Sequence, residues 1–122
     1  MTESSIVFLP CADIEKTVSF YRDVLGLKVS QKQSDRLYIF DTGYGYWGFC
    51  QYSDQRPPLS GNKGVCLSLN LSSNEEVLMK YEELKDRCQV IRQPQKHPDF
   101  PVYSFFIADP DGYMVEFQKI QM

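Results

Sequence analysis

The feature that most constrains this chain is the repetition of one order of structural signals in its two halves. Each half opens with an apolar run that predicts a strand, continues with a helical pattern and then gives signals for three further strands. A stretch rich in proline and small polar residues, at about 53–62, predicts a linker between the halves. We therefore expect one α+β domain over residues 1–122, built from tandem βαβββ modules at about 1–56 and 63–122.

The first half begins with an apolar run over residues 6–11, which predicts a strand, and Asp13 can cap the helix that follows. Apolar residues at helical spacing predict that helix: Ile14, Val18, Tyr21 and Leu25. Gly26 suits the position just past the helix end. Three further strands are expected, at 28–31, 36–41 and 46–52.

The second half repeats this order, with a strand expected at 65–71. The start of its helix is marked by a possible capping box in either of two registers, formed by Ser72, Ser73, Glu75 and Glu76. The apolar stripe of the helix is Val77, Leu78, Tyr81 and Leu84. Strands are then expected at 89–92, 103–107 and 113–119, the last of them after the turn signal Asp109-Pro110-Asp111-Gly112.

Alternation along two strands of the second half predicts which face each side chain takes. In strand 65–71 the leucines alternate with Cys66, Ser68 and Asn70, so the leucines are expected to lie under helix 73–86. The last strand places Val115 and Phe117 on one face and the following residues on the other: Met114, Glu116 and Gln118. The semi-polar face is typical of a cleft, and Glu116 is expected to point into it.

The strands of the first half are apolar at both parities. We expect Arg36, Tyr38 and Phe40 on the cleft side, because Leu37 and Ile39 would take the other face. Arg36 could bind an anionic substrate or pair with a cleft carboxylate, or be an ordinary edge-strand arginine. Aromatic residues also occupy both parities of strand 46–52, so part of this strand is expected to line a pocket, with the inward parity left open.

Two segments carry a resemblance to a known family. Residues 9–27, LPCADIEKTVSFYRDVLGL, resemble the opening module of the vicinal oxygen chelate superfamily, and residues 106–117, FIADPDGYMVEF, resemble its closing strand. This superfamily includes glyoxalase I, bleomycin-resistance proteins, fosfomycin-resistance enzymes and extradiol dioxygenases. The resemblance covers nearly the whole chain. It implies paired βαβββ modules that form an open barrel-like sheet with a central cleft, usually completed in a homodimer.

The resemblance also identifies four positions where metal-using members carry their ligands. In this chain these positions are Ile6, Gly48 or Phe49, Cys66 and Glu116. Glu116 alone matches a family ligand, and Cys66 could bind a soft metal. Because a tight site needs at least three protein ligands, no metal cofactor is expected, unless Gln51 or His97 supplies a ligand from elsewhere.

Ten residues are candidates for lining the cleft: Phe8, Arg36, Tyr38, Phe40, Trp47, Phe49, Cys66, Ser68, Met114 and Glu116. Glu116 could be a metal ligand, a general base or a counter-ion for a cationic ligand, or a strand glutamate paired with an arginine. His97 lies in a proline-rich loop, where it could be solvated or belong to a lid. Cys66 fits a small buried residue better than a nucleophile, since no histidine is expected beside it. No catalytic residue is assigned.

Composition excludes several classes of function. The formal net charge of −3 argues against a nucleic-acid surface, and no apolar run is long enough to span a membrane. The N-terminus lacks the pattern of a secretory signal, so a cytoplasmic location is expected. The four cysteines lack metal-site spacing and are expected to be buried, reduced thiols: Cys11, Cys50, Cys66 and Cys88.

These expectations favour a homodimer that binds a small, partly aromatic or cationic molecule without a catalytic metal. In this it would be closest to the bleomycin-resistance members of the superfamily. The alternative is a glyoxalase-like lyase, or another metal-assisted enzyme, that uses Glu116 in an altered site. A third interpretation is a dimer whose cleft is vestigial and whose role is protein interaction.

Overall fold

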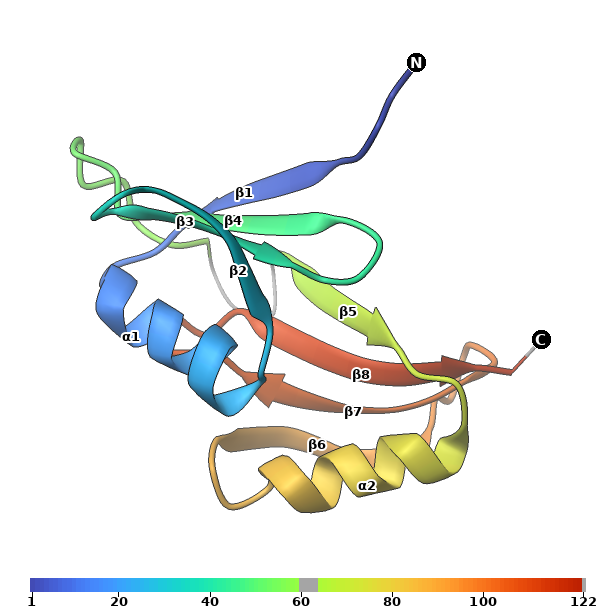
Figure 1. Ribbon diagram of the computed structural model, residues 1–122. Helices are drawn as coiled ribbons and strands as arrows, with labels where there is room; N and C mark the ends of the chain where they lie inside the picture. The colour runs from blue at the N-terminus through green and yellow to red at the C-terminus, as the bar shows by residue number, and fades with distance from the viewer. Residues whose placement is uncertain (60–63, 122) are drawn as a thin grey trace. The chain divides into compact units, whose positions relative to one another are not determined.

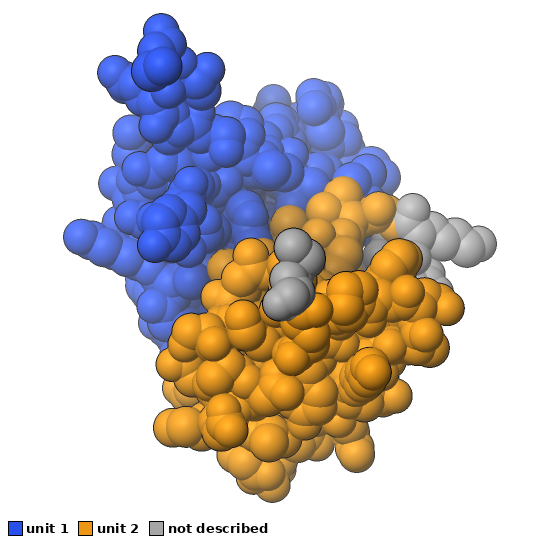
Figure 2. Space-filling view, turned by 90° about the vertical axis from the view of Figure 1, so that its right-hand side faces the viewer, with its two compact units in different colours: residues 1–59 blue, residues 60–122 orange. Residues whose placement is uncertain are grey.

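The computed structural model describes residues 1–59 and 64–121. The chain forms two compact units, which we call unit 1 (residues 1–59) and unit 2 (residues 60–122). Each unit is a four-stranded sheet with helical structure on one face (Figure 1), and Figure 2 colours the units separately. The expected α+β class with two tandem βαβββ modules is confirmed, and both sheets are open. The last part of the expected linker, residues 60–62, lies outside the described residues.

Unit 1 contains six elements in chain order: β1 (Ile6–Pro10), α1 (Ile14–Val18), the π-helical segment η1 (Ser19–Val24), β2 (Lys28–Ser34), β3 (Leu37–Asp41) and β4 (Tyr46–Cys50). Its strand order is β1-β4-β3-β2. The pair β1–β4 is parallel, and the other two pairs are antiparallel.

Unit 2 repeats this plan with five elements: β5 (Cys66–Asn70), α2 (Asn74–Leu84), β6 (Gln89–Lys96), β7 (Val102–Ala108) and β8 (Met114–Ile120). Its strand order is β5-β8-β7-β6, again with one parallel pair, β5–β8, and two antiparallel pairs. The last strand of each unit therefore lies inside its sheet, between the first and third strands of that unit.

The helical segment of unit 1 begins and ends as expected. Asp13 Oδ1 accepts hydrogen bonds from the backbone N–H groups of Glu15 and Lys16, at 3.1 and 3.4 Å. At the other end, the Leu25 N–H donates to the carbonyl of Phe20, a five-residue spacing that defines the π-helical turn. Gly26, with a φ of 76°, then takes the left-handed conformation that reverses the chain.

Side-chain caps also fix the local structure of unit 2. Ser73 Oγ accepts the N–H of Glu76 at 3.1 Å, and the Glu76 carboxylate accepts the N–H of Ser72. The capping register is therefore Ser73 with Glu76. The turn before β8 is closed by Asp109, whose Oδ1 accepts the N–H groups of Asp111 and Tyr113.

The helix-covered face of each sheet is built on aromatic rings. In unit 1, the ring of Tyr21 is fully buried, and three rings of the sheet lie with their centroids 4.4 to 6.2 Å from it: Phe40, Trp47 and Phe49. In unit 2, Phe105 lies 5.4 Å from Tyr81 of α2 and 5.4 Å from Phe117. Leu67, Val115 and Phe117 lie on this face, as the alternation predicts.

The predicted face of β3 is wrong. Tyr38 and Phe40 lie on the helix-covered side, where they pair with Phe49 and Trp47, while Leu37 and Ile39 take the opposite face. The sequence Leu-Tyr-Ile-Phe has apolar residues in both alternating positions, so its pattern does not indicate which of the two sets faces the helix. The aromatic packing of Tyr21 decides the orientation.

Other differences lie at the edges of the sheets. Arg36 lies in the exposed turn before β3 instead of in the strand. β6 continues through Pro94 to Lys96, which an edge strand permits because one side of its backbone needs no partner. Within the described part of the chain, none of the four cysteines is in a disulfide bond, but only Cys11 is buried, and Cys66 is exposed. No helix among the described residues has the length and apolar character needed to cross a membrane.

Candidate functional site

The helix-free face of unit 2, the side of its sheet opposite α2, carries polar side chains in rows across the strands. Residues paired on neighbouring strands share a face. The register pairs Ser68 with Glu116, Glu116 with Phe106, and Phe106 with Arg92. These four residues form a continuous row across all four strands, which we call the Glu116 row.

The carboxylate of Glu116 is the most constrained group in this row. Ser68 Oγ donates to Glu116 Oε1 at 2.6 Å, and Cys66 Sγ lies 4.0 Å from the same oxygen. Glu116 is only 8% exposed. Its second oxygen, Oε2, receives no hydrogen bond from residues 1–59 or 64–121. One oxygen is therefore oriented by the protein while the other has acceptor capacity to spare.

The other end of the row combines an aromatic ring with a cation. The guanidinium carbon of Arg92 lies 5.9 Å from the centroid of the Phe106 ring, within the range of a cation–π contact. The row thus presents a carboxylate, a ring and a guanidinium in order across the sheet. Arg92 and Phe106 are not among the candidates from the sequence. Phe106 lies opposite Glu116 through the regular pairing of β7 with β8, whereas the place of Arg92 opposite Phe106 depends on the bulged register of β6, which residue spacing does not reveal.

A second polar row lies beside the first. Gln118 Nε2 donates to Asn70 Oδ1 at 2.8 Å, and Ser104 pairs with Gln118 on the other side. The hydroxyl of Ser104 is fully buried and has no hydrogen-bond partner among the described residues. Such an unpaired buried group costs free energy.

Cys66 stays protonated at neutral pH. Although the residue as a whole is exposed, neighbouring groups partly desolvate its thiol, and this raises the pKa of the thiol above the ordinary value. The hydrogen bond with Ser68 acts in the opposite direction, and the negative charge of Glu116 raises the pKa further. A thiol is a poor nucleophile and a poor metal ligand compared with a thiolate. The side chain therefore contributes contact and a weak hydrogen bond to this face.

The register of unit 1 identifies the counterpart of Glu116. Phe8 pairs with Gly48 in the same place where Ser68 pairs with Glu116, so the counterpart is Gly48, and Phe49 lies on the helix-covered face. On the helix-free face of unit 1, the ring of Phe8 lies over Gly48. Ile39 is the next residue in this row. Phe8 and Ile39 have no metal-binding atom in their side chains, and Gly48 has no side chain.

The residues at the four ligand positions do not fit a catalytic metal. Ile6 and Gly48 offer no donor atom, which leaves the Cys66 thiol and the Glu116 carboxylate. Within the described part of the chain, no group of three His, Cys, Asp or Glu side chains is placed to hold an ion. A divalent cation held tightly by a protein needs more donors than this pair supplies.

The two side chains that could have supplied a further ligand are engaged elsewhere. Gln51 Oε1 accepts the N–H of Ile14 at 3.0 Å and so completes the start of α1. His97 Nδ1 accepts the N–H groups of Asp99 and Phe100 at 3.0 and 3.2 Å, within its own loop. Both contacts stabilise local chain turns.

The ten candidate residues divide into three groups. Five lie on helix-free faces: Phe8 in unit 1, and Cys66, Ser68, Met114 and Glu116 in unit 2. Four lie on the helix-covered face of unit 1: Tyr38, Phe40, Trp47 and Phe49. The remaining residue, Arg36, is in an exposed turn.

Two βαβββ units, each with a parallel first-and-last strand pair and a helix on one face, define the class of tandem-module α+β proteins. The sequence matches the Glyoxalase/Bleomycin resistance protein/Dioxygenase superfamily over residues 5–117, and the chain belongs to this superfamily. No curated protein is significantly similar to it in sequence.

Solved structures share the fold. A glyoxalase/bleomycin resistance protein/dioxygenase from Nocardioides is similar over 98% of this chain and 84% of its own, with 18% identity and a TM-score of 0.78. A hypothetical protein from S. aureus has 25% identity and a TM-score of 0.76, covering 98% and 95% of the two chains. A lactoylglutathione lyase from Agrobacterium tumefaciens has 21% identity and a TM-score of 0.75, covering 98% and 94%.

Proposed function

We propose that this protein binds a small molecule on the helix-free face of unit 2 without using a catalytic metal. The observation that carries the proposal is the state of Glu116, with Oε1 held by Ser68 and Oε2 unengaged by the described residues. A carboxylate so little exposed is stabilised by a cationic or hydrogen-bond-donating partner. Phe106, the next residue in the row, offers a surface for a flat apolar group.

The proposed ligand is therefore a small cationic or donor-bearing molecule with an aromatic part. In this proposal the protein acts as a cytoplasmic homodimer and is similar in character to the metal-independent, bleomycin-resistance-like members of its superfamily. Native mass spectrometry of the gently desalted, untagged protein reports subunit number and retained mass in one experiment. A dimer that carries an organic mass and no metal supports the proposal.

Titration calorimetry tests the role of Glu116 directly, with ethidium as a flat cationic probe and fluorescein as a flat anionic one. We expect ethidium to bind, and Glu116→Gln to weaken it about tenfold or more, because a charge-assisted contact is lost. The matched control is Glu75→Gln, since Glu75 lies in the exposed first turn of α2. Equal binding of both probes, or equal loss in both variants, would contradict the proposal.

The second candidate is a metal-assisted lyase that uses Glu116 in an altered site. It is favoured by one observation, the approach of Cys66 Sγ to within 4.0 Å of the Glu116 carboxylate. A metal that binds only the folded protein must raise the melting temperature. A rise with nickel, zinc, manganese or iron(II) that disappears in Glu116→Gln would favour this function over the first.

A further inference from the structure

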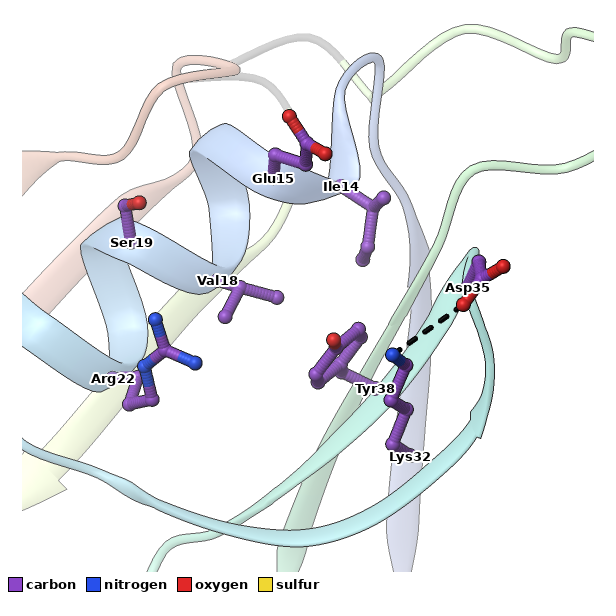
Figure 3. Close-up of a pocket in the computed structure, with 8 residues that line it drawn as sticks. All are labelled: Ile14, Glu15, Val18, Ser19, Arg22, Lys32, Asp35 and Tyr38. Atoms are coloured by element: carbon purple, nitrogen blue, oxygen red, sulfur yellow. Dashed lines mark ion pairs between the residues drawn. The ribbon is translucent and has the colours of Figure 1, made fainter.

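Unit 1 contains a cavity of about 400 Å³ between its helical segment and the β2–β3 hairpin (Figure 3). It is lined by eight residues: Ile14, Glu15, Val18, Ser19, Arg22, Lys32, Asp35 and Tyr38. The cavity lies on the helix-covered side of β3, so it is a different place from the helix-free faces described above. Its volume is within the range of small-molecule sites.

Three hydrogen-bond donors converge on this cavity from three elements. Arg22 comes from η1, Lys32 from β2 and Tyr38 from β3, and Lys32 and Tyr38 are direct partners in the sheet. Lys32 Nζ lies 5.5 Å from the centroid of the Tyr38 ring. In Figure 3, the guanidinium of Arg22 and the hydroxyl of Tyr38 extend into the same space between helix and hairpin.

The two cations have donors to spare. Arg22 binds Asp23 through Nε and Nη2, at 2.8 and 3.2 Å, and Nη1 has no partner among the described residues. Lys32 pairs with Asp35 at 3.4 Å, which leaves further ammonium protons. The neighbouring Tyr38 raises the pKa of Lys32 most, followed by Asp35, so this side chain stays charged.

The acidic neighbours do not close the site to an anion. The side chains of Asp23 and Asp35 are 53% and 97% exposed, and ion pairs of such exposed groups contribute little to stability because water screens them. A ligand oxyanion can therefore replace either aspartate at little cost. Glu15 lies in the first turn of α1, seven residues before Arg22, and so lines the opposite end of the cavity.

Unit 2, which has the same fold as unit 1, shows that the fold does not require these donors. The helix caps Asp13 and Ser73 correspond, which places Glu82 at the position of Arg22. The registers of β3–β4 and β7–β8 place Phe105 at the position of Tyr38, and Phe105 is fully buried against Tyr81. Unit 2 thus packs a ring without a hydroxyl where unit 1 presents one.

We propose that this cavity binds a small organic oxyanion, a carboxylate or a phosphate ester, through Arg22, Lys32 and Tyr38. The apolar part of the ligand would lie against Ile14 and Val18, which lie four residues apart on one stripe with Arg22. Planar guanidinium donors suit oxyanions of both kinds. The site is independent of Glu116.

Amide chemical shifts of the ¹⁵N-labelled full chain test this, with inorganic phosphate and butyrate as separate probes at constant ionic strength. We expect at least one probe to give saturable shifts confined to residues 14–22 and 32–38. Arg22→Gln and Lys32→Gln should each weaken that probe about tenfold, the loss expected for one charge-assisted hydrogen bond. Tyr38→Phe keeps the ring and should weaken it less.

Lys16→Gln is the matched control, because Lys16 belongs to α1 but does not line the cavity. It should leave the affinity unchanged. The proposal is overturned if neither probe gives saturable shifts, if chloride gives the same shifts, or if Arg22→Gln and Lys16→Gln behave alike. Saturable shifts centred on residues 66–70 and 114–118 would also overturn it, since they would place the anion on unit 2.

Discussion

The ring of Phe8 lies across Gly48, so closely that a Cβ atom on Gly48 would be 2.6 Å from Phe8 Cδ1. The two residues are direct partners in the β1–β4 ladder. An aromatic ring over a strand glycine covers backbone that would otherwise lack side-chain contacts. Any side chain at position 48, which corresponds to Glu116, would therefore have to displace the ring of Phe8.

This contact gives a double-mutant prediction. Gly48→Ala should lower the free energy of unfolding by about 1 kcal/mol or more, because the ring of Phe8 must move. In a Phe8→Ala background the same change should be neutral or stabilising, since alanine is a better strand residue than glycine. Urea unfolding of the four proteins measures the coupling, and additive effects would show that the contact is unimportant.

Cys66 provides a pH prediction. Because the carboxylate of Glu116 helps to raise the pKa of the thiol, Glu116→Gln should lower that pKa and speed alkylation by iodoacetamide near pH 8. The rate at each cysteine can be followed by peptide mass spectrometry over a range of pH. Cys88 is an internal control: burial also raises the pKa of its thiol, but Glu116 does not contribute. An unchanged rate profile for Cys66 would refute the coupling.

The cap of α2 predicts a loss of stability at acid pH. Hydrogen bonds with Ser72 lower the pKa of Glu76 in the folded protein. The carboxylate therefore contributes fully to the free energy of unfolding above its ordinary pKa of 4.5, and this contribution is lost as the pH falls through the lower pKa of the folded protein. Glu76→Gln should therefore flatten the dependence of stability on pH in this range. Ser73→Ala removes the other half of the cap and should cost about 1 kcal/mol at neutral pH. Thermal unfolding at several pH values measures both effects.

Thr17 gives a stabilising prediction. Its side chain is fully buried, and its hydroxyl has no hydrogen-bond partner within the described residues. Thr17→Val keeps the shape and removes the unpaired group, so it should raise the free energy of unfolding by about 1 kcal/mol. Thr2→Val, in the exposed N-terminal segment, is the control for a general effect of the substitution. A loss of stability would mean that the hydroxyl has a partner in solution.

The parts of the fold predicted correctly were those with a local physical signal. Asp13 caps its helix, Gly26 ends the helical segment, and the leucines of β5 alternate toward α2. Each depends on residues only a few positions apart, so the sequence shows the cause directly.

The errors arose where the cause is distant in sequence. Tyr38 and Phe40 face the helix because the aromatic rings of the sheet pack against Tyr21, and the sequence of β3 itself does not indicate this orientation. Arg92 joins the Glu116 row because two register shifts interrupt the pairing of β6 with β7. The cavity beside Arg22 depends on how a hairpin lies against a helix. These features depend on how several segments of the chain pack together, so the residue pattern of any one segment does not reveal them.

The position of β8 inside its sheet has a consequence for the order of events during synthesis. The hydrogen bond between Ser68 and Glu116 joins residues 48 positions apart, and among the strands of the described residues β5 pairs with β8 alone. On a ribosome, β5 emerges well before the strand it needs, and its edge stays unpaired until nearly the whole of unit 2 has been translated. The Glu116 row is therefore among the last features to form, and mutations that slow the docking of β8 should reduce the yield of soluble protein more than its final stability.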